Sequence, residues 1–118
     1  MNQTNQINRV NRRDQMTEIK ETQIRPVLKL VTQIMRRHLP ATSHRILLFG
    51  SWATLESTAR SDIDIAILGE APVDELIMAQ IKEEIDRLPT LRKVEVVDLW
   101  DVEDRFRNKV EQQAEILS

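Results

Sequence analysis

Residues 45–68 read RILLFGSWATLESTARSDIDIAIL, and this stretch decides the fold. It contains two apolar runs whose length and composition are typical of buried β-strands. The first run ends at Gly50-Ser51, where the following residues favour a short helix that begins at the serine. The second run begins around Asp62 and Asp64. The stretch therefore predicts a strand, a short helix, a polar loop and a second strand.

Further elements are predicted on both sides of this stretch. Apolar residues recur at helical spacing over residues 22–39 and again over residues 73–88, and a proline follows each pattern. Residues 93–99 read as a third strand, and a last helix is predicted from Asp101 onward. Because helices and strands alternate along the chain, we expect an α/β (α+β) fold.

Length and composition narrow the classes of protein to consider. The 118 residues suffice for one domain, and the lack of cysteine excludes disulfides and a cysteine nucleophile. Residues 1–16 hold few apolar side chains, so we expect a flexible tail over 1–16 and one domain over 17–118. The domain carries 14 basic and 18 acidic residues, a net charge of -4, which argues against direct nucleic-acid binding. With no membrane span in the sequence, a cytoplasmic protein is expected.

Asp62 and Asp64 are separated by one residue in the second strand. Successive strand side chains alternate, so both carboxylates are predicted to lie on one face, with Ile63 and Ile65 on the other. Two close carboxylates repel unless a cation lies between them, and Mg²⁺ prefers such oxygen ligands. Taken alone, the pair is weak evidence, because two surface acids on an edge strand give the same pattern.

Two further features carry possible chemistry. Gly50-Ser51 lies between a strand and a helix, where backbone N–H groups and a hydroxyl can bind an anion, although an ordinary turn with a serine cap fits as well. Asp98 lies at the end of the third strand, where its carboxylate could be a third metal ligand or a proton acceptor. The alternative for Asp98 is a carboxylate that caps the next turn.

The combination of these features is more specific than any one of them. The segments GSWA at residues 50–53 and SDIDI at residues 61–65, with their spacing, resemble the signature of the polymerase-β-like nucleotidyltransferase superfamily. Its minimal, MNT-type branch is the most similar, over residues 46–99. The resemblance implies a small mixed sheet flanked by helices, which agrees with the element order above.

The resemblance also implies roles for individual residues. The nucleoside triphosphate would be bound by Gly50, Ser51 and Ser61. Mg²⁺ would be held by three catalytic carboxylates, those of Asp62, Asp64 and Asp98.

Thr54 and Leu55 depart from the family pattern, which usually has a basic residue followed by a glycine at these positions. The change at Thr54 removes positive charge near the phosphates, and the change at Leu55 stiffens the loop.

MNT-type proteins are typically encoded beside a helical HEPN-type partner. The resemblance thus implies a Mg²⁺-dependent antitoxin that transfers AMP from ATP to a tyrosine of a HEPN ribonuclease toxin, in a hetero-oligomer with it. One alternative is an antitoxin that neutralises its partner by contact alone. Another is nucleotidyl transfer to a small molecule such as an aminoglycoside.

Overall fold

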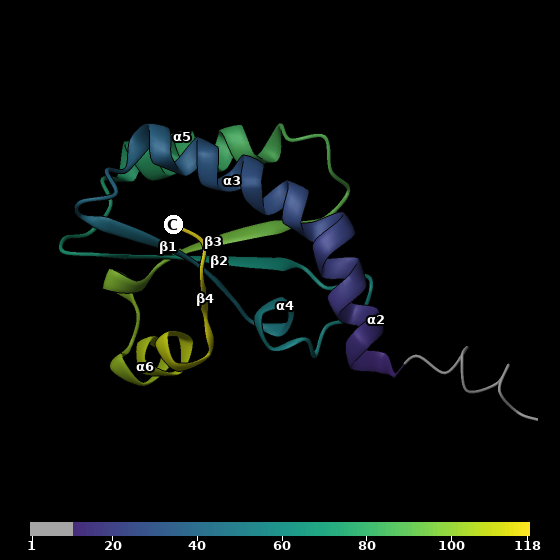
Figure 1. Ribbon diagram of the computed structural model, residues 1–118. Coiled ribbons are helices and arrows are strands. Elements are labelled where there is room, and N and C mark those ends of the chain that lie inside the picture. The colour runs from purple at the N-terminus through teal and green to yellow at the C-terminus, as the bar shows by residue number, and fades with distance from the viewer. Residues whose placement is uncertain (1–10) are drawn as a thin grey trace, which may run out of the picture.

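The computed structural model describes residues 11–118, which form a four-stranded sheet with flanking helices (Figure 1). The strand order is β3-β2-β1-β4; β1 is antiparallel to β2 and to β4, while β2 and β3 are parallel. The strands are β1 (His44–Phe49), β2 (Ile63–Gly69), β3 (Val94–Asp98) and β4 (Glu115–Ile116). The mixed sheet predicted from the sequence is therefore confirmed.

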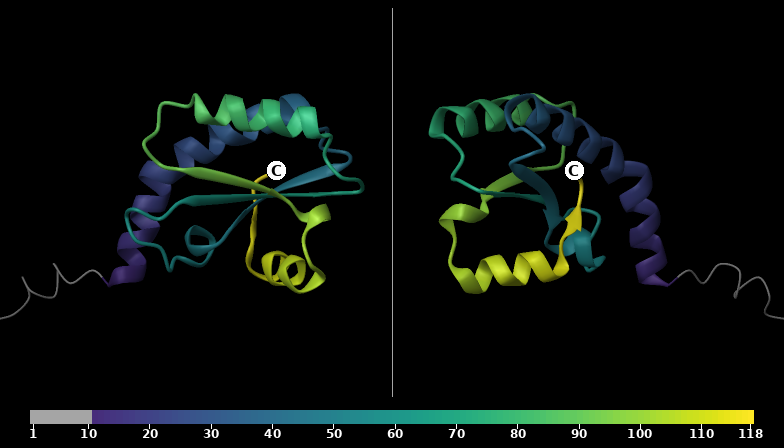
Figure 2. Two further views of the ribbon diagram at one scale, coloured as in Figure 1. Left: turned by 180° about the vertical axis from the view of Figure 1, so that it is seen from behind. Right: turned by 60° about the vertical axis from the view of Figure 1, so that its left-hand side comes forward.

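Helices lie on both sides of the sheet. Helices α3 (Arg25–His38) and α5 (Glu75–Asp86) cover one face, and α6 (Asp104–Gln113) lies on the opposite face (Figure 2). The four-residue α4 (Ser51–Thr54) follows β1, and the 3₁₀ turn η2 (Leu99–Asp101) leads from β3 toward α6. None of the helices within residues 11–118 has the length and apolar character needed to cross a membrane.

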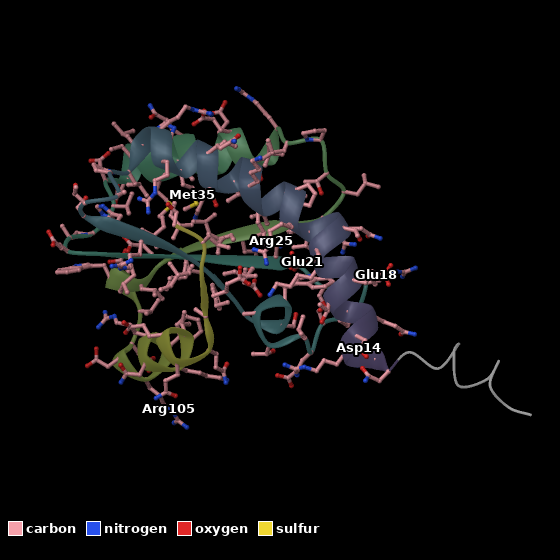
Figure 3. The ribbon with its side chains drawn as sticks, in the orientation of Figure 1. Asp14, Glu18, Glu21, Arg25, Met35 and Arg105 are labelled. Atoms are coloured by element: carbon pink, nitrogen blue, oxygen red, sulfur yellow. The ribbon has the colours of Figure 1, made fainter. Side chains whose placement is uncertain are left out.

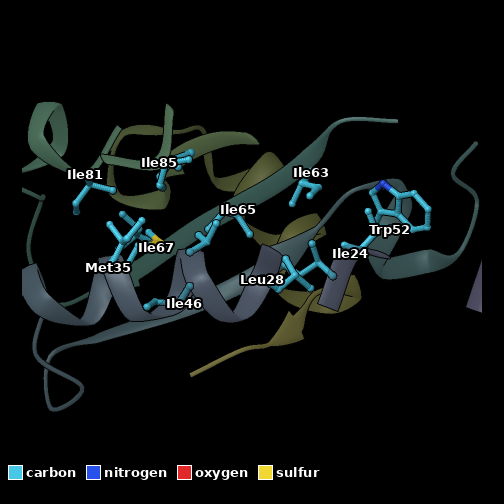
Figure 4. Packing of buried hydrophobic residues seen from close by; sticks show 14 of the residues in the cluster. Ile24, Leu28, Met35, Ile46, Trp52, Ile63, Ile65, Ile67, Ile81 and Ile85 are labelled. Atoms are coloured by element: carbon cyan, nitrogen blue, oxygen red, sulfur yellow. The ribbon is translucent and has the colours of Figure 1, made fainter. Parts of the chain in front are cut away.

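The main core lies between the sheet and helices α3 and α5. Ile63, Ile65 and Ile67 of β2 are fully buried there, and Figure 4 shows side chains from both helices around them. Since neighbouring strand residues point to opposite faces, Asp64 and Ala66 point toward the α6 side. A smaller apolar cluster on that side consists of Leu47, Ala66, Leu99 and Val110.

Helix α3 is the end of a longer helical rod. It is preceded without a break by α2 (Arg12–Ile19) and by the π-helical turn η1 (Lys20–Ile24). Figure 3 labels Asp14 and Glu18 of α2, Glu21 of η1 and Arg25 at the start of α3. Pro26 explains the wider turn, because proline lacks an N–H group and its ring clashes with the carbonyl four residues earlier. The Arg25 N–H group instead donates to the Lys20 carbonyl, five residues back.

The structure differs from the predicted tail at residues 11–16. The Asn11 side chain caps α2 by accepting from the Asp14 N–H group at 2.8 Å, and Met16 is only 7% exposed. The Arg12 guanidinium donates to the Ser57 carbonyl at 2.7 Å. Packing against the domain thus orders this segment despite its few apolar residues. Residues 1–10, the rest of the predicted tail, lie outside the described residues.

Candidate active site

Asp64 lies directly against Gly50, where β1 ends. In the antiparallel register Phe49 is opposite Asp64, so the residue after β1 meets the acid pair. A Cβ atom on Gly50 would collide with the Oδ2 atom of Asp64, and Gly50 has a φ of 75°. Both observations require glycine at this position. The sheet therefore brings together the Gly50-Ser51 and Asp62-Asp64 motifs, as their spacing predicted.

The pair Asp62 and Asp64 is arranged as the strand period predicts. Asp62 is exposed just before β2, and Asp64 is partly buried within it, with Ile63 and Ile65 on the core side. Burial raises the pKa of Asp64, and the negative charges of Glu95 and Asp62 raise it further. The negative charge of ionised Asp64 is therefore unfavourable in this position, and a bound cation would stabilise it.

Glu95 is the third acid beside the pair. Parallel pairing of β2 with β3 places Glu95 next to Asp64, and residues in register project from the same face of the sheet. The Lys93 Nζ atom lies 2.9 Å from Glu95 Oε1. The hydrogen bond to Glu95 raises the pKa of Lys93, and the charges of Glu95 and Asp62 add to this effect. Lys93 thus partly neutralises the acidic cluster.

The structure does not bring Asp98 to this cluster. Asp98 pairs with Ile67, three residues further along β3 than Glu95, and shares the core-facing side with Val94 and Val96. Its carboxylate, 8% exposed, accepts from the N–H groups of Val73 at 2.8 Å and Trp100 at 3.0 Å. Asp98 thus caps the turn that follows β3, which is the alternative that the sequence left open for it. Side chains alternate along β3, so Glu95 lies on the opposite face from Asp98, and the pairing with Asp64 places it beside the acid pair.

Ser61 is bonded within its own loop. Its hydroxyl accepts from the Thr58 N–H group at 2.8 Å, and its carbonyl accepts from the Trp52 indole N–H at 3.1 Å. Trp52 is fully buried, so this bond ties the loop before Asp62 to the core. In this arrangement Ser61 shapes the loop; its predicted contact with the nucleotide stays a prediction.

Leu55 preserves the backbone geometry expected of the family's glycine. Helix α4 is followed by Leu55, whose φ of 62° and ψ of 26° are left-handed and whose N–H group donates to the Ser51 carbonyl. The loop after Gly50-Ser51 therefore keeps a turn that normally requires glycine.

A cavity of about 340 Å³ lies beside Gly50, the residue against which Asp64 packs. Phe49, Gly50, Ser51 and Thr54 line one side of it, and helix α6 lines the other. Its volume lies within the range usual for small-ligand sites. A second hollow, of about 680 Å³, shares Phe106 and Lys109 with this cavity.

The donor set fits a hard cation that is shared with phosphates. Among residues 11–118, no three His, Cys, Asp or Glu side chains are already arranged to hold a metal. Asp62 and Asp64 nevertheless offer carboxylate oxygens at one point, and Mg²⁺ commonly takes one or two carboxylates with substrate phosphates as further ligands. The residues are therefore suited to a metal that arrives with a nucleotide.

Comparison with known proteins identifies the family. A family model described as polymerase beta, nucleotidyltransferase, matches residues 31–118, well over half of the chain. The chain belongs to this nucleotidyltransferase family. As a member it is a nucleotidyltransferase, in agreement with the resemblance read from residues 50–65. No curated protein matches the chain in sequence.

Solved structures share the fold of this nucleotidyltransferase. One, described as a minimal nucleotidyltransferase, is 25% identical with a TM-score of 0.61, over 78% of this chain and 90% of that one. A toxin–antitoxin complex with AMP-PNP is 24% identical with a TM-score of 0.63, over 77% and 72%. The complex of tri-AMPylated Shewanella oneidensis HEPN toxin with MNT antitoxin is 22% identical with a TM-score of 0.60, over 80% and 71%.

Proposed function

We propose that this nucleotidyltransferase transfers AMP from ATP to a tyrosine hydroxyl of a HEPN-type toxin, and that it acts as the antitoxin of that partner in the cytoplasm. The observation that carries the proposal is the contact between Asp64 and Gly50 beside the cavity lined by Ser51. Carboxylates for a metal and a loop suited to phosphates thereby lie at one point.

The choice of partner has separate support. The structures of similar fold include a toxin–antitoxin complex with an ATP analogue and a HEPN toxin that carries AMP groups while bound to its MNT antitoxin. Because their identity to this chain is below 25%, the likeness shows a shared fold alone. Adenylylation of a HEPN-type partner, within a hetero-oligomer, is our proposal for this chain.

The proposed reaction is an in-line displacement at the α-phosphorus of ATP. The tyrosine oxygen bonds to that phosphorus, the bond from phosphorus to the oxygen bridging the α- and β-phosphates breaks, and pyrophosphate leaves. Gly50 and Ser51 orient the phosphates, and Asp62 and Asp64 hold Mg²⁺, which when bound would offset the negative charge of the phosphates. We assign to Glu95 the acceptance of the tyrosine proton, because it lies beside Asp64.

The test is transfer of label from α-³²P-ATP in the presence of Mg²⁺ and a lysate of the native host. We expect a labelled protein band with the wild-type chain and none with Asp62→Asn/Asp64→Asn. Mass spectrometry of the band should locate AMP on tyrosine. With γ-³²P-ATP the labelled bands should be the same whether or not the chain is added. A chain that labels no protein in the lysate contradicts the proposal.

Two other outcomes would support the alternatives. If Asp62→Asn/Asp64→Asn still neutralises the toxin on co-expression, the chain acts by contact alone. If label appears only in the small-molecule fraction, for example with an aminoglycoside as acceptor, the acceptor is not a protein.

A further inference from the structure

Lys109 of helix α6 lines the same cavity as Gly50 and Ser51. Thr54, whose side chain carries no charge, also lines that cavity. We propose that Lys109 binds the phosphates of the nucleotide and supplies positive charge to this cavity. This inference rests on the proposed nucleotide-binding function.

Lys109 is held in place by the packing of α6 on the sheet. Phe106, one turn earlier, meets Phe49 edge to face with ring centroids 5.9 Å apart, and Val110 is buried in the smaller core cluster. The Arg107 Nε atom donates to the Leu99 carbonyl at 2.9 Å. The helix therefore has a defined position, and the stem of Lys109 starts from a fixed point beside the cavity.

The charges around the cavity favour this assignment. Lys109 is the basic residue among those that line the cavity, and Glu56 is the acidic one. Lys93, beside the acid cluster, is paired with Glu95. Over residues 11–118 Lys109 forms no ion pair, so its ammonium group is free for a ligand. A triphosphate beside Asp64 and Glu56 needs such a cation, because their negative charges oppose its own.

Binding measurements with purified protein test the inference. Titration calorimetry would use a non-hydrolysable ATP analogue with Mg²⁺, and separately inorganic tripolyphosphate. We expect Lys109→Ala to weaken both affinities by roughly 10- to 100-fold, the usual range for a hydrogen bond to a charged group. Lys109→Arg should retain most of the affinity. Lys29→Ala, which removes an exposed lysine from α3 on the other face of the sheet, is the matched control and should bind as the wild type does.

A second variant tests the relation to position 54. Thr54→Arg in the Lys109→Ala background should recover at least part of the lost affinity, because both side chains border one cavity. If wild type and Lys109→Ala bind the analogue equally, the inference is overturned while the proposed function survives. If the wild type binds neither ligand, both are overturned. Circular dichroism should show unchanged unfolding for Lys109→Ala, since the side chain is exposed.

Discussion

Leu55 adopts a left-handed backbone conformation with a φ of 62°, and among residues 11–118 it is the one residue other than glycine with a positive φ. A Cβ atom in this region costs roughly 1–2 kcal/mol. The Leu55 side chain packs against the main core, so its removal also loses apolar contacts. The conformation therefore has a cost that the packing offsets.

Replacing Leu55 with glycine and with alanine separates these two effects. Both variants lose the packing, but only Leu55→Gly also loses the backbone strain. We expect Leu55→Gly to be more stable than Leu55→Ala by about 1 kcal/mol in urea unfolding. Inside helix α4, Ala53→Gly should instead destabilise by roughly 0.5–1 kcal/mol. Equal stability of the two Leu55 variants would show that the turn relaxes.

Glu95 and Asp98 lie on one strand but face opposite sides, so their substitutions should have opposite consequences. Asp98→Ala leaves the N–H groups of Val73 and Trp100 without their acceptor and should cost about 1–3 kcal/mol of stability. Glu95→Gln removes an exposed charge, so its unfolding should stay close to wild type. Its AMP transfer should fall about 100-fold or more, as for a lost general base.

Urea unfolding and label transfer, measured on both variants, decide between the two acids. We expect Asp98→Ala to retain AMP transfer at a temperature where the variant is folded. If that variant were folded and inactive while Glu95→Gln stayed active, Asp98 and not Glu95 would be the catalytic carboxylate.

The sequence was sufficient for those parts of the site that depend on local patterns. The faces of Asp62 and Asp64 follow from the strand period, and the Gly50 turn follows from its place after an apolar run. The third acid depends on the register between β2 and β3, which spacing along the chain does not determine. The predicted third acid was Asp98, but the pairing of β2 with β3 places Glu95, three residues earlier, beside Asp64.

At the scale of elements, periodicity found the strands and helices that bury a full apolar face. It missed α2, where Met16 is the one buried side chain, and β4, whose two residues are too short for any period. Both elements depend on distant contacts. Strand β4 pairs Ile116 with Leu47 of β1, and its Glu115 is bonded to the helical rod at Lys20, with Nζ and Oε1 2.8 Å apart.

Glu115 should therefore make stability depend on pH. Burial alone would raise its pKa, but the hydrogen bonds from Arg25 and Lys20 outweigh burial and lower it. A carboxylate with a lowered pKa stabilises the fold above its ordinary pKa of 4.5, and that contribution is lost as the pH falls through the lowered value. Glu115→Gln should cost roughly 2–3 kcal/mol at pH 7, because Lys20 is only 8% exposed and loses its partner.

Urea unfolding at pH 7 and at pH 3 measures this effect. The difference between wild type and Glu115→Gln should be smaller at pH 3 than at pH 7, because the contribution of the carboxylate is lost as the pH falls below its ordinary pKa and through the lowered one. Lys20→Met should lower the stability at pH 7 by less than Glu115→Gln does, because it removes the buried ammonium group and leaves no buried cation without a partner. A difference that is the same at both pH values would show that the contacts of Glu115 act without its charge.

Across the whole molecule, the candidate site lies on the side of the sheet with the smaller core. Helices α3 and α5 are held by the large apolar cluster, whereas α6 contributes Val110 to a smaller cluster with three other buried residues, Leu47, Ala66 and Leu99. The cavity lies between α6 and the β1–α4 corner, so a ligand there would join α6 to the sheet. We therefore expect α6 to be the less stable layer in the absence of ligand and the layer that nucleotide stabilises most.

Hydrogen exchange and thermal unfolding test this in one set of samples. With Mg²⁺ and an ATP analogue at 100 times the dissociation constant, global stability should rise by about 2.7 kcal/mol, and α6 amides should gain more protection than those of α3. Mg²⁺ alone should have little effect, because Asp62 and Asp64 supply too few ligands to hold it tightly without phosphates. Asp62→Asn/Asp64→Asn should lose most of the shift. Protection that spreads equally over α3, α5 and α6 would mean that the ligand stabilises the fold without bridging its weaker layer, and that the nucleotide binds away from the α6 wall.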